Sequence, residues 1–419
     1  MKSRVLIIGG GASGLMAAIT ARRQGASVTI LEHTDKIGKK ILSTGNGKCN
    51  LTNLEQKPEY YRSSQPKFPQ AALKAFGVEK TLDFFESIGV YWKSKNGYIY
   101  PNSEQAASVL EVLSAEISHL GIPVIYQTEV LSIEKKKNPL TKFNVTTINN
   151  RETKSYEADS VILAAGGMAA PITGSDGSGY TLAKSLGHTI VKPVPALVQL
   201  RAEGDFFKQL AGVRTEAKVS LFVDRQYIIF DQGELQLTDY GISGIPVFQI
   251  SRFAARALEE KKKVSVAIDF LPQLNVKETY RFLMNRKKQL FYKNCEAYLI
   301  GLFHKKIGQV LLKHSHITPA KKVSQLTEEE VSVLCKKIKE FKINILATNS
   351  FANAQVCCGG IATMEIQPDT MESKLIKGLY FSGEIIDVDG ICGGYNLQWA
   401  WSSGYVAGTH AAGQKRGGK

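Results

Sequence analysis

The sequence is poor in cysteine and has no long apolar run. Its 419 residues include only six cysteines, and no two of them form a Cys-x-x-Cys pair. A disulfide framework and a redox-active dithiol are therefore not expected, and the thiols are predicted to stay reduced in a cytoplasm. No stretch of about 18 apolar residues occurs, so no transmembrane helix is predicted.

Metal and hydrolase signatures are also missing. His304, His314 and His316 lie in one region, but basic residues surround them, and no metal site is expected. The serines of Gly174-Ser-Asp-Gly-Ser-Gly179 are spaced wrongly for the nucleophile elbow of a hydrolase.

Length and charge indicate a globular protein of two or three domains, because 419 residues exceed one ordinary core. The net charge is +15, and the segment 273–345 alone carries 15 Lys+Arg against 6 Asp+Glu. Such a segment is either a solvated helical surface or a face that attracts nucleic acid, anionic lipid or an acidic substrate.

The strongest signal is a glycine-rich turn directly after an apolar strand. Val5-Leu-Ile-Ile-Gly-Gly-Gly-Ala-Ser-Gly14 leads into a helix predicted over 12–24, and 27–31 reads as the next strand. Glu32 ends that strand and can accept a hydrogen bond from a ribose hydroxyl. Strand, helix, strand and acid in this order predict an adenine-dinucleotide site.

Each residue of the turn has a physical role in such a site. Gly9 allows the tight turn, Gly11 lets backbone N–H groups approach a pyrophosphate, and Gly14 lets the helix pack against the sheet. Ala12 and Ser13 open the helix, whose N-terminal dipole points at the phosphates.

Further along the chain, the pattern predicts a nucleotide-binding domain that is interrupted and then completed. Apolar strands that run into glycine recur at 160–165 and 378–383, and a last helix is expected at 397–409. Between them come β-like segments at 194–201, 217–222, 226–230 and 264–269, and then a mostly helical, basic stretch. We predict an α/β fold: a Rossmann-like domain made of 1–191 and 346–419, an inserted β-rich domain of 192–272 and a basic helical domain of 273–345, the insertion serving as a substrate or cap region.

Two further glycine-containing blocks complete the pattern. They are Val161-Ile-Leu-Ala-Ala-Gly-Gly167 with Thr173-Gly-Ser-Asp-Gly-Ser-Gly179, and 378–384 with Asp387-Val-Asp-Gly390 and Gly393-Gly-Tyr-Asn-Leu-Gln-Trp399. With the first fingerprint, they resemble the two-dinucleotide-fold flavoproteins that hold FAD. More narrowly, Gly45-Asn-Gly-Lys-Cys-Asn-Leu-Thr-Asn53, Thr370-Met-Glu-Ser-Lys374 and 378–401 resemble the bacterial aminoacetone-oxidase-like or bile-acid-reductase-like NAD(P)/FAD-dependent oxidoreductases.

The resemblance implies that the C-terminal block contacts the flavin half of FAD. Glu384 would accept hydrogen bonds from the ribityl hydroxyls, and Gly383 would permit close backbone approach. Asn396 and Leu397 would begin the last helix, with their N–H groups facing the pyrimidine edge of the flavin. The positive end of that helix would stabilise an anionic reduced flavin.

It also implies contacts from earlier segments. Lys40, Asn46 and Gly47 would lie near the pyrophosphate or the isoalloxazine, Val130 would present its backbone to the adenine, and Gly166 would lie beside the FAD.

The chain departs from the family pattern in a few places. Asn46 and Lys48 stand where a glycine and an arginine are common, so a point charge replaces a guanidinium fork. Cys392 stands where threonine is usual, and its thiol either approaches the ring or only fills space.

The expected activity is hydride transfer between a small organic substrate and flavin N5, with NAD(P)H or oxygen as the other redox partner. Because only one Gly-x-Gly-x-x-Gly occurs, NAD(P)H would visit the flavin transiently. No catalytic residue is assigned, although Tyr240 and Tyr395 are candidates for handling protons. The sequence carries no signature of a particular oligomeric state.

Two alternatives remain open because of the basic segment 273–345. One is an FAD-dependent enzyme that modifies RNA, such as tRNA. The other is a non-catalytic flavin-binding protein whose insertion contacts nucleic acid or a membrane.

Overall fold

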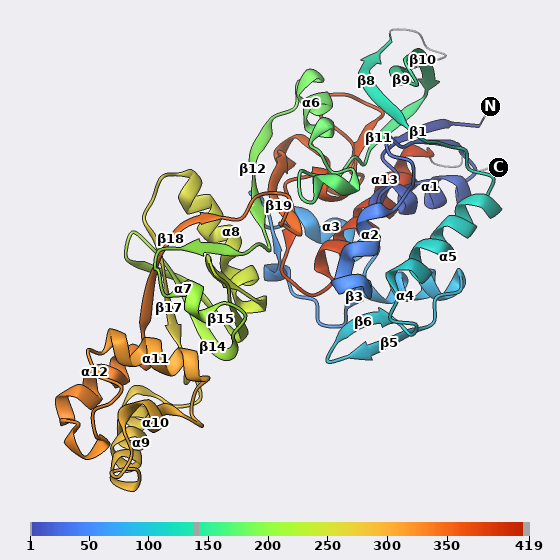
Figure 1. Cartoon of the computed structure of the whole chain (residues 1–419). Coiled ribbons are helices and arrows are strands. Elements are labelled where there is room, and N and C mark those ends of the chain that lie inside the picture. Colours follow the sequence, from blue (N-terminus) through green and yellow to red (C-terminus); the bar gives the residue numbers. More distant parts are fainter. Residues whose placement is uncertain (1, 137–141, 414–419) are drawn as a thin grey trace. The chain divides into compact units, whose positions relative to one another are not determined.

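The structure is a computed structural model that describes residues 2–136 and 142–413 (Figure 1). The chain divides into two compact units. The first joins Met1–Pro193 to Gln355–Lys419, and the second is Val194–Ala354. Each unit has its own hydrophobic core. Among the described residues, no helix combines the length and hydropathy that a membrane span requires.

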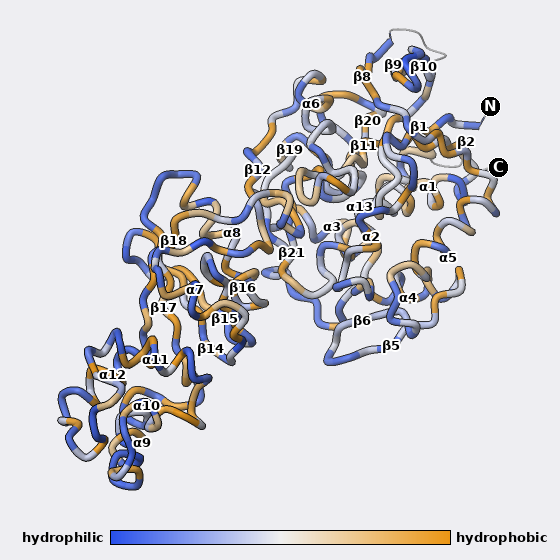
Figure 2. The backbone as a smooth tube through the Cα atoms, viewed as in Figure 1, coloured by the Kyte–Doolittle hydropathy of each residue, from blue (hydrophilic) through white to orange (hydrophobic). Residues whose placement is uncertain are grey.

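A five-stranded parallel sheet forms the centre of the first unit. In spatial order its strands are β20 (Leu379–Phe381), β11 (Ser160–Leu163), β1 (Arg4–Ile8), β2 (Ser27–Leu31) and β7 (Val124–Ile125). Ile7 of β1 pairs with Ile162 and with Ile30, and the consecutive residues 5–8 are all buried. Because successive side chains of a strand point to opposite faces, burial of consecutive residues means that both faces of β1 are covered. The backbone of β1 and β11 is accordingly coloured as hydrophobic in Figure 2. The predicted Rossmann-type α/β fold is confirmed.

Helix α1 (Ala12–Arg23) packs along α13 (Tyr395–Ala411) beside this sheet (Figure 1). The contact is close because α13 presents two glycines: Cβ atoms on Gly404 and Gly408 would lie 2.4 Å from the carbonyl oxygens of Ser13 and Ala17. The pair of helices therefore joins the beginning of the chain to a segment near its end.

Smaller elements complete the first unit. Its other α-helices are α2 (Lys39–Ser43), α3 (Phe68–Ala75), α4 (Val78–Ser87), α5 (Ala106–His119) and α6 (Ser178–Ser185). An antiparallel sheet contains β8 (Thr128–Lys135), β9 (Phe143–Asn149) and β10 (Glu152–Ala158). Shorter ladders are formed by β3 (Thr52–Asn53), β5 (Trp92–Lys95) and β6 (Tyr98–Pro101), by β4 (Tyr61–Arg62) with β21 (Asp389–Gly390), and by β12 (Ile190–Ala196) with β19 (Val356–Ile361).

The second unit is built on a closed six-stranded barrel. Around the barrel the strands are β13 (Leu200–Ala202), β16 (Gly241–Ser243), β15 (Gln226–Leu237), β14 (Arg214–Val223), β17 (Val264–Asp269) and β18 (Phe341–Thr348). The short helix α7 (Phe207–Leu210) precedes β14. The predicted β-rich and helical character of the insertion is confirmed.

Helix α8 (Ile245–Glu259) lies outside the elements predicted above. It starts at Gly244, where φ is +104° and a Cβ would lie 2.3 Å from the carbonyl oxygen of Glu234. Its buried residues include Val247, Ile250, Ala254 and Ala257. Their spacing of three or four residues indicates a helix. The segments on either side have strand patterns, and this is why the helix was not predicted.

Four helices interrupt the barrel between β17 and β18. They are α9 (Val276–Gln289), α10 (Cys295–Leu299), α11 (Lys305–His314) and α12 (Glu328–Lys339). Capping boxes start two of them: Asn275 with Glu278, and Thr327 with Glu330. Each box satisfies N–H groups that a helix start leaves unpaired.

A buried histidine in the first unit makes stability depend on pH. Nδ1 of His188 lies 3.1 Å from a carboxylate oxygen of Glu365, and Nε2 lies 2.9 Å from the Ser373 hydroxyl. Burial lowers the pKa of His188, and this effect outweighs the negative charge of Glu365, which raises it. Between its pKa in the folded protein and the ordinary value of about 6.5, the unfolded chain binds more protons, so the free energy of unfolding decreases as pH falls through this window.

We expect His188→Gln to remove this dependence. Urea unfolding measured near pH 7.5 and near pH 5.5 should show a larger acid loss of stability for the wild type than for the variant. Parallel pH curves for the two proteins would contradict the assignment.

Candidate cofactor-binding site

A cavity of about 550 Å³ opens in the first unit beside the carboxyl ends of β1 and β2. Ligands of open α/β sheets bind at this edge. Most of the predicted site residues line it: Gly9, Gly11, Ala12, Ser13, Glu32, Lys40, Val130, Gly166, Glu384, Asn396 and Leu397.

The remaining predicted residues lie outside the cavity lining. Gly14 and Gly383 serve packing, because a Cβ on Gly14 would lie 2.0 Å from the Gly9 carbonyl oxygen and one on Gly383 would lie 2.4 Å from the Ser13 hydroxyl. Asn46 and Gly47 are exposed in the 3-10 turn Thr44–Gly47.

The glycine-rich turn has room for an approaching phosphate. At Gly9 φ is +104°, and a Cβ would lie 2.5 Å from the carbonyl oxygen of Ala164, so the chain turns tightly against the segment after β11. Gly11 is the N-cap of α1, and its Cβ position has no heavy atom within 4 Å. The first turn of α1 therefore lines open space, where its unpaired N–H groups and dipole attract an anion.

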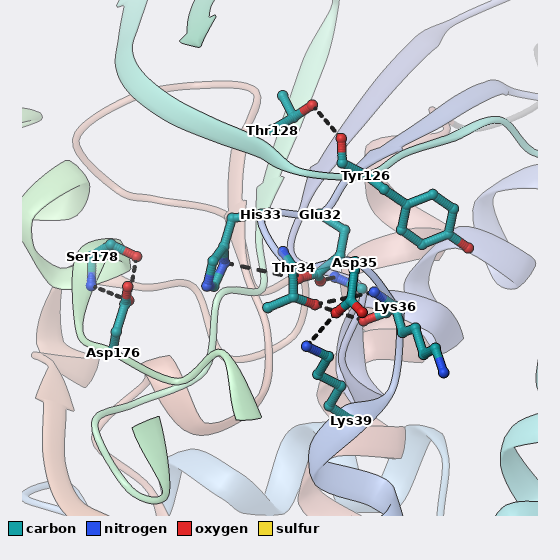
Figure 3. Close-up of polar contacts among 11 residues, drawn as sticks. Glu32, His33, Thr34, Asp35, Lys36, Lys39, Tyr126, Thr128, Asp176 and Ser178 are labelled. Carbon is teal, nitrogen blue, oxygen red and sulfur yellow. Dashed lines mark hydrogen bonds and ion pairs between the residues drawn. The ribbon is translucent and has the colours of Figure 1, made fainter. Parts of the chain in front are cut away.

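Glu32 is fixed at the wall of this cavity. One of its carboxylate oxygens accepts from Gly10 N at 2.7 Å, and the other accepts from Thr34 N at 2.8 Å. The carboxylate retains lone pairs for a hydroxyl. Figure 3 shows Glu32 with His33 and Thr34 on one side and Asp176 on the loop across from them.

Asp176 adds a second carboxylate to the lining. Its Oδ1 accepts from the N–H and the hydroxyl of Ser178, at 2.9 and 2.6 Å (Figure 3). Burial opposes ionisation of Asp176, but the bonds from Ser178 outweigh burial and lower its pKa. Two acidic groups, Glu32 and Asp176, therefore mark the end of the cavity near β2.

Lys40 and Glu384 form an ion pair at the cavity wall. Lys40 Nζ lies 2.6 Å from Glu384 Oε2, and Glu384 Oε1 accepts from Cys357 N at 2.8 Å. The side chains are 24% and 19% exposed. An acceptor beside an ammonium suits a chain of hydroxyl groups joined to a pyrophosphate.

A second helix N-terminus reaches the cavity at the start of α13. Gly394 caps it with φ +95°, and a Cβ there would lie 2.8 Å from the Thr52 carbonyl. The Asn396 side chain accepts from Gly390 N at 2.8 Å and donates to Gly390 O at 2.9 Å. It thus holds the preceding loop, while the first turn of α13 lines the cavity with Asn396 and Leu397. The positive end of α13 favours negative charge there.

The cysteines offer no dithiol at this site. All six lie within the described residues, and none of them forms a disulfide. Burial raises the pKa of Cys49 and of Cys357 to about 12, so both thiols stay protonated. The described part of the chain also contains no group of His, Cys, Asp and Glu suited to a metal ion.

The two tyrosines considered for proton handling have other partners. Tyr395 donates its hydroxyl to the Glu55 carbonyl at 3.0 Å, and neither Tyr395 nor Tyr240 is in the cavity lining. Asn349 donates to the Tyr240 hydroxyl at 3.0 Å within the second unit.

The cavity includes residues that the patterning did not single out. Asn150 and Arg151 form the turn between β9 and β10, and Gln355 precedes β19. Such turn residues carry no motif. The sequence does contain a signal for Asp176, because it lies in the glycine-rich block Thr173-Gly-Ser-Asp-Gly-Ser-Gly179. In this region, the resemblance to the flavoprotein family assigns only Gly166, which precedes the block, to the cofactor site.

Comparison with known proteins identifies the family. The model of the HI0933-like protein Rossmann domain matches residues 3–410. The chain is 47% identical to a 3-dehydro-bile acid delta(4,6)-reductase of Clostridium scindens, over 98% of this chain and 99% of that protein. It is also 31% identical to a ribosomal RNA dihydrouridine synthase of Haemophilus influenzae, over 96% and 97% of the two chains.

Among solved structures, a 3-ketosteroid delta1-dehydrogenase from Sterolibacterium denitrificans aligns with 98% of this chain and 99% of its own, at a TM-score of 0.50 and 13% identity. At that identity the likeness concerns the fold alone. The predicted FAD cofactor and oxidoreductase class are confirmed, and the glycine turn, the two helix N-termini and the carboxylates of the cavity fit FAD. The chain is an FAD-dependent oxidoreductase that belongs to the HI0933-like family of Rossmann-domain proteins.

Proposed function

We propose that the protein reduces a carbon–carbon double bond conjugated with a carbonyl group, using FAD and electrons from NAD(P)H. The observation that carries the proposal is a shared chemistry in the names of two full-length relatives. A 3-keto bile acid with double bonds at positions 4 and 6 is a conjugated enone, and the uracil of uridine has its C5=C6 bond conjugated with the C4 carbonyl. In both substrates, reduction adds a hydride to the β-carbon and a proton to the α-carbon.

The cavity supports this chemistry through the groups of the chain itself. When bound, FAD supplies the hydride of its N5 position. The first turn of α1 would hold the pyrophosphate, Glu32 the ribose, and Glu384 with Lys40 the ribityl chain. The N-terminus of α13, at Asn396 and Leu397, would favour negative charge on the flavin ring. Val130 and Gly166 line the remaining walls.

The first substrate class is a steroid-like 3-keto acid. It is favoured by the 47% identity to the bile acid reductase over nearly the whole of both chains.

The second class is uracil within RNA. It is favoured by the surplus of basic residues in 273–345, since a small-molecule reductase has no need of a positively charged helical surface. The RNA-modifying alternative named from the sequence is of this kind.

Anaerobic flavin reoxidation tests the reaction class. NADPH or NADH should bleach the flavin band of the purified protein, and a 3-keto steroid with a 4,5 double bond, or an RNA containing uridine, should restore it. The product should be heavier by two hydrogens. The 3-keto steroid without the double bond is the matched control and should leave the flavin reduced.

Two results would contradict the proposal. One is a flavin that neither nicotinamide cofactor reduces. The other is a reduced flavin that oxygen reoxidises but no conjugated double bond does, which would indicate an oxidase.

A further inference from the structure

A basic groove lies between two helices of the second unit. It has a volume of about 470 Å³ and is lined from α9 and α12 by Val276, Lys277, Tyr280, Arg281, Met284, Ser332, Cys335 and Lys336. Three cationic side chains, one phenol ring and several apolar groups therefore share one concave surface.

The cations of the groove have no acidic partner among the ion pairs of the described residues. Elsewhere in the segment 273–345 lysines are paired: Lys305 with Glu296, and Lys321 with Glu330. The nearby acids serve helix starts, since Glu278 accepts from Asn275 N in its capping box and 328–330 form the first turn of α12. Lys336 lies about 9–12 Å along the axis from the acids of that turn.

The position of Lys277 is not explained by helix stability. It lies in the first turn of α9, where the helix dipole disfavours a positive charge. The cations that complement the dipole are those of the last turn, Arg286, Lys287 and Lys288. Lys277 is exposed and belongs to no ion pair among the described residues, so its charge is available to an external anion.

An exposed aromatic pair follows the end of α9. Phe291 and Tyr292 are 59% and 61% exposed, their rings are 5.8 Å apart, and Lys293 lies 5.8 Å from the Tyr292 ring. Positions 277, 281, 284 and 288 form one stripe of α9, and the aromatic pair begins three residues after position 288. The stripe is about 17 Å long, which spans several phosphates of a nucleic acid strand.

We propose that the basic groove and the aromatic pair form an RNA-binding surface, with phosphates held by Lys277, Arg281, Lys288 and Lys336 and bases stacked on Phe291 and Tyr292. Alternating cations and exposed rings are what a single strand requires, because its backbone is anionic and its unpaired bases present flat faces. A concave groove suits a strand better than it suits the flat surface of a membrane. The inference rests on the proposed function, for which it names a uracil-bearing RNA as the substrate partner.

Equilibrium binding of fluorescein-labelled oligouridine to the full-length, FAD-loaded protein tests the surface. Four phosphate contacts predict a slope of about −2.8 for log K against log [KCl], or roughly 50-fold weaker binding at 200 than at 50 mM. The double variant Lys277→Gln, Arg281→Gln should weaken binding and halve the slope to about −1.4. Phe291→Ala with Tyr292→Ala should weaken binding, at an unchanged slope, by roughly 5- to 150-fold for each base that loses its stacking partner.

The matched control is Lys262→Gln with Lys342→Gln. It removes the same charge from exposed lysines that pair with Glu260 and Glu340, outside the groove, and should bind like the wild type. The flavin spectrum of each variant verifies its folding. No NAD(P)H is added, so failure of the reductase reaction does not affect this result.

Two outcomes overturn the proposal. In one, the groove variants and the control bind oligouridine with the same affinity and salt slope as the wild type. In the other, the groove variants lose binding to phosphatidylglycerol vesicles and keep binding to RNA, which would assign the surface to a membrane.

Discussion

Gly11→Ala is expected to abolish FAD binding and leave the unliganded fold intact. Gly11 has φ −79° and ψ −173°, which alanine adopts freely, and its Cβ position has no heavy atom within 4 Å. The added methyl group enters the cavity where the pyrophosphate approaches the first turn of α1. Loss of the charged hydrogen bonds made there should raise the Kd for FAD at least about 100-fold, or ~2.7 kcal/mol.

Gly14→Ala is the matched comparison, because it adds the same methyl group one turn further into the helix. Its Cβ would lie 2.0 Å from the Gly9 carbonyl oxygen, so this variant should lose both the cofactor and thermal stability. The measurements are FAD titration of the apoprotein and its melting temperature. A Gly11→Ala protein that retains its yellow colour through purification, or that melts as early as Gly14→Ala, would exclude the assigned role.

Gln398→Leu is expected to cost about 3 kcal/mol of unfolding free energy. Gln398 is fully buried in α13. Its Oε1 accepts from the Thr52 hydroxyl at 2.6 Å, and its Nε2 donates to Thr81 at 2.9 Å, to Ser402 at 2.9 Å and to the Phe76 carbonyl at 3.1 Å. Leucine fills a similar volume and leaves several buried polar groups without this partner.

Urea unfolding of Gln398→Leu and of Gln226→Leu measures the effect. Gln226 is exposed at the start of β15, so its replacement should change the unfolding free energy by less than about 0.5 kcal/mol. Equal unfolding curves for the two variants would show that the buried network contributes little.

The parts of the site that could be predicted are those fixed by local chemistry. Gly9 has φ +104° and turns tightly against Ala164, where only glycine fits, whereas Gly11 leaves open space for a phosphate. A strand followed by this glycine-rich turn therefore predicts the local geometry of the site. The start of α13 was expected at 397, whereas the helix begins at Tyr395, because Gly394 in the left-handed region ends the preceding loop two residues earlier. Asn46 and Gly47 stay predictions, because both are exposed in a turn whose first residue, Thr44, lines the cavity.

The barrel could not be predicted because its closure depends on distant pairings. β13 pairs with β18, where Leu200 lies opposite Thr348, and the helices α9–α12 lie between these strands in the sequence. The strands are short and alternate like any half-buried strand, so their patterns do not specify which neighbour each one takes.

Because α1 packs against α13, the first unit cannot be completed until the C-terminal part of the chain has been synthesised. Ser13 of α1 also donates to the carbonyl of Ser382, which precedes α13 and lies 369 residues after Ser13 in the chain. At elongation rates of about 5–20 residues per second, roughly 20–75 s pass between synthesis of the two partners. During that delay the nascent nucleotide half stays exposed and unable to retain flavin, whereas Val194–Ala354 is continuous and can collapse on its own as it emerges. Lack of flavin should therefore impair the folding of completed chains and not of nascent ones. Chaperones should bind the N-terminal half first, because it stays exposed during synthesis.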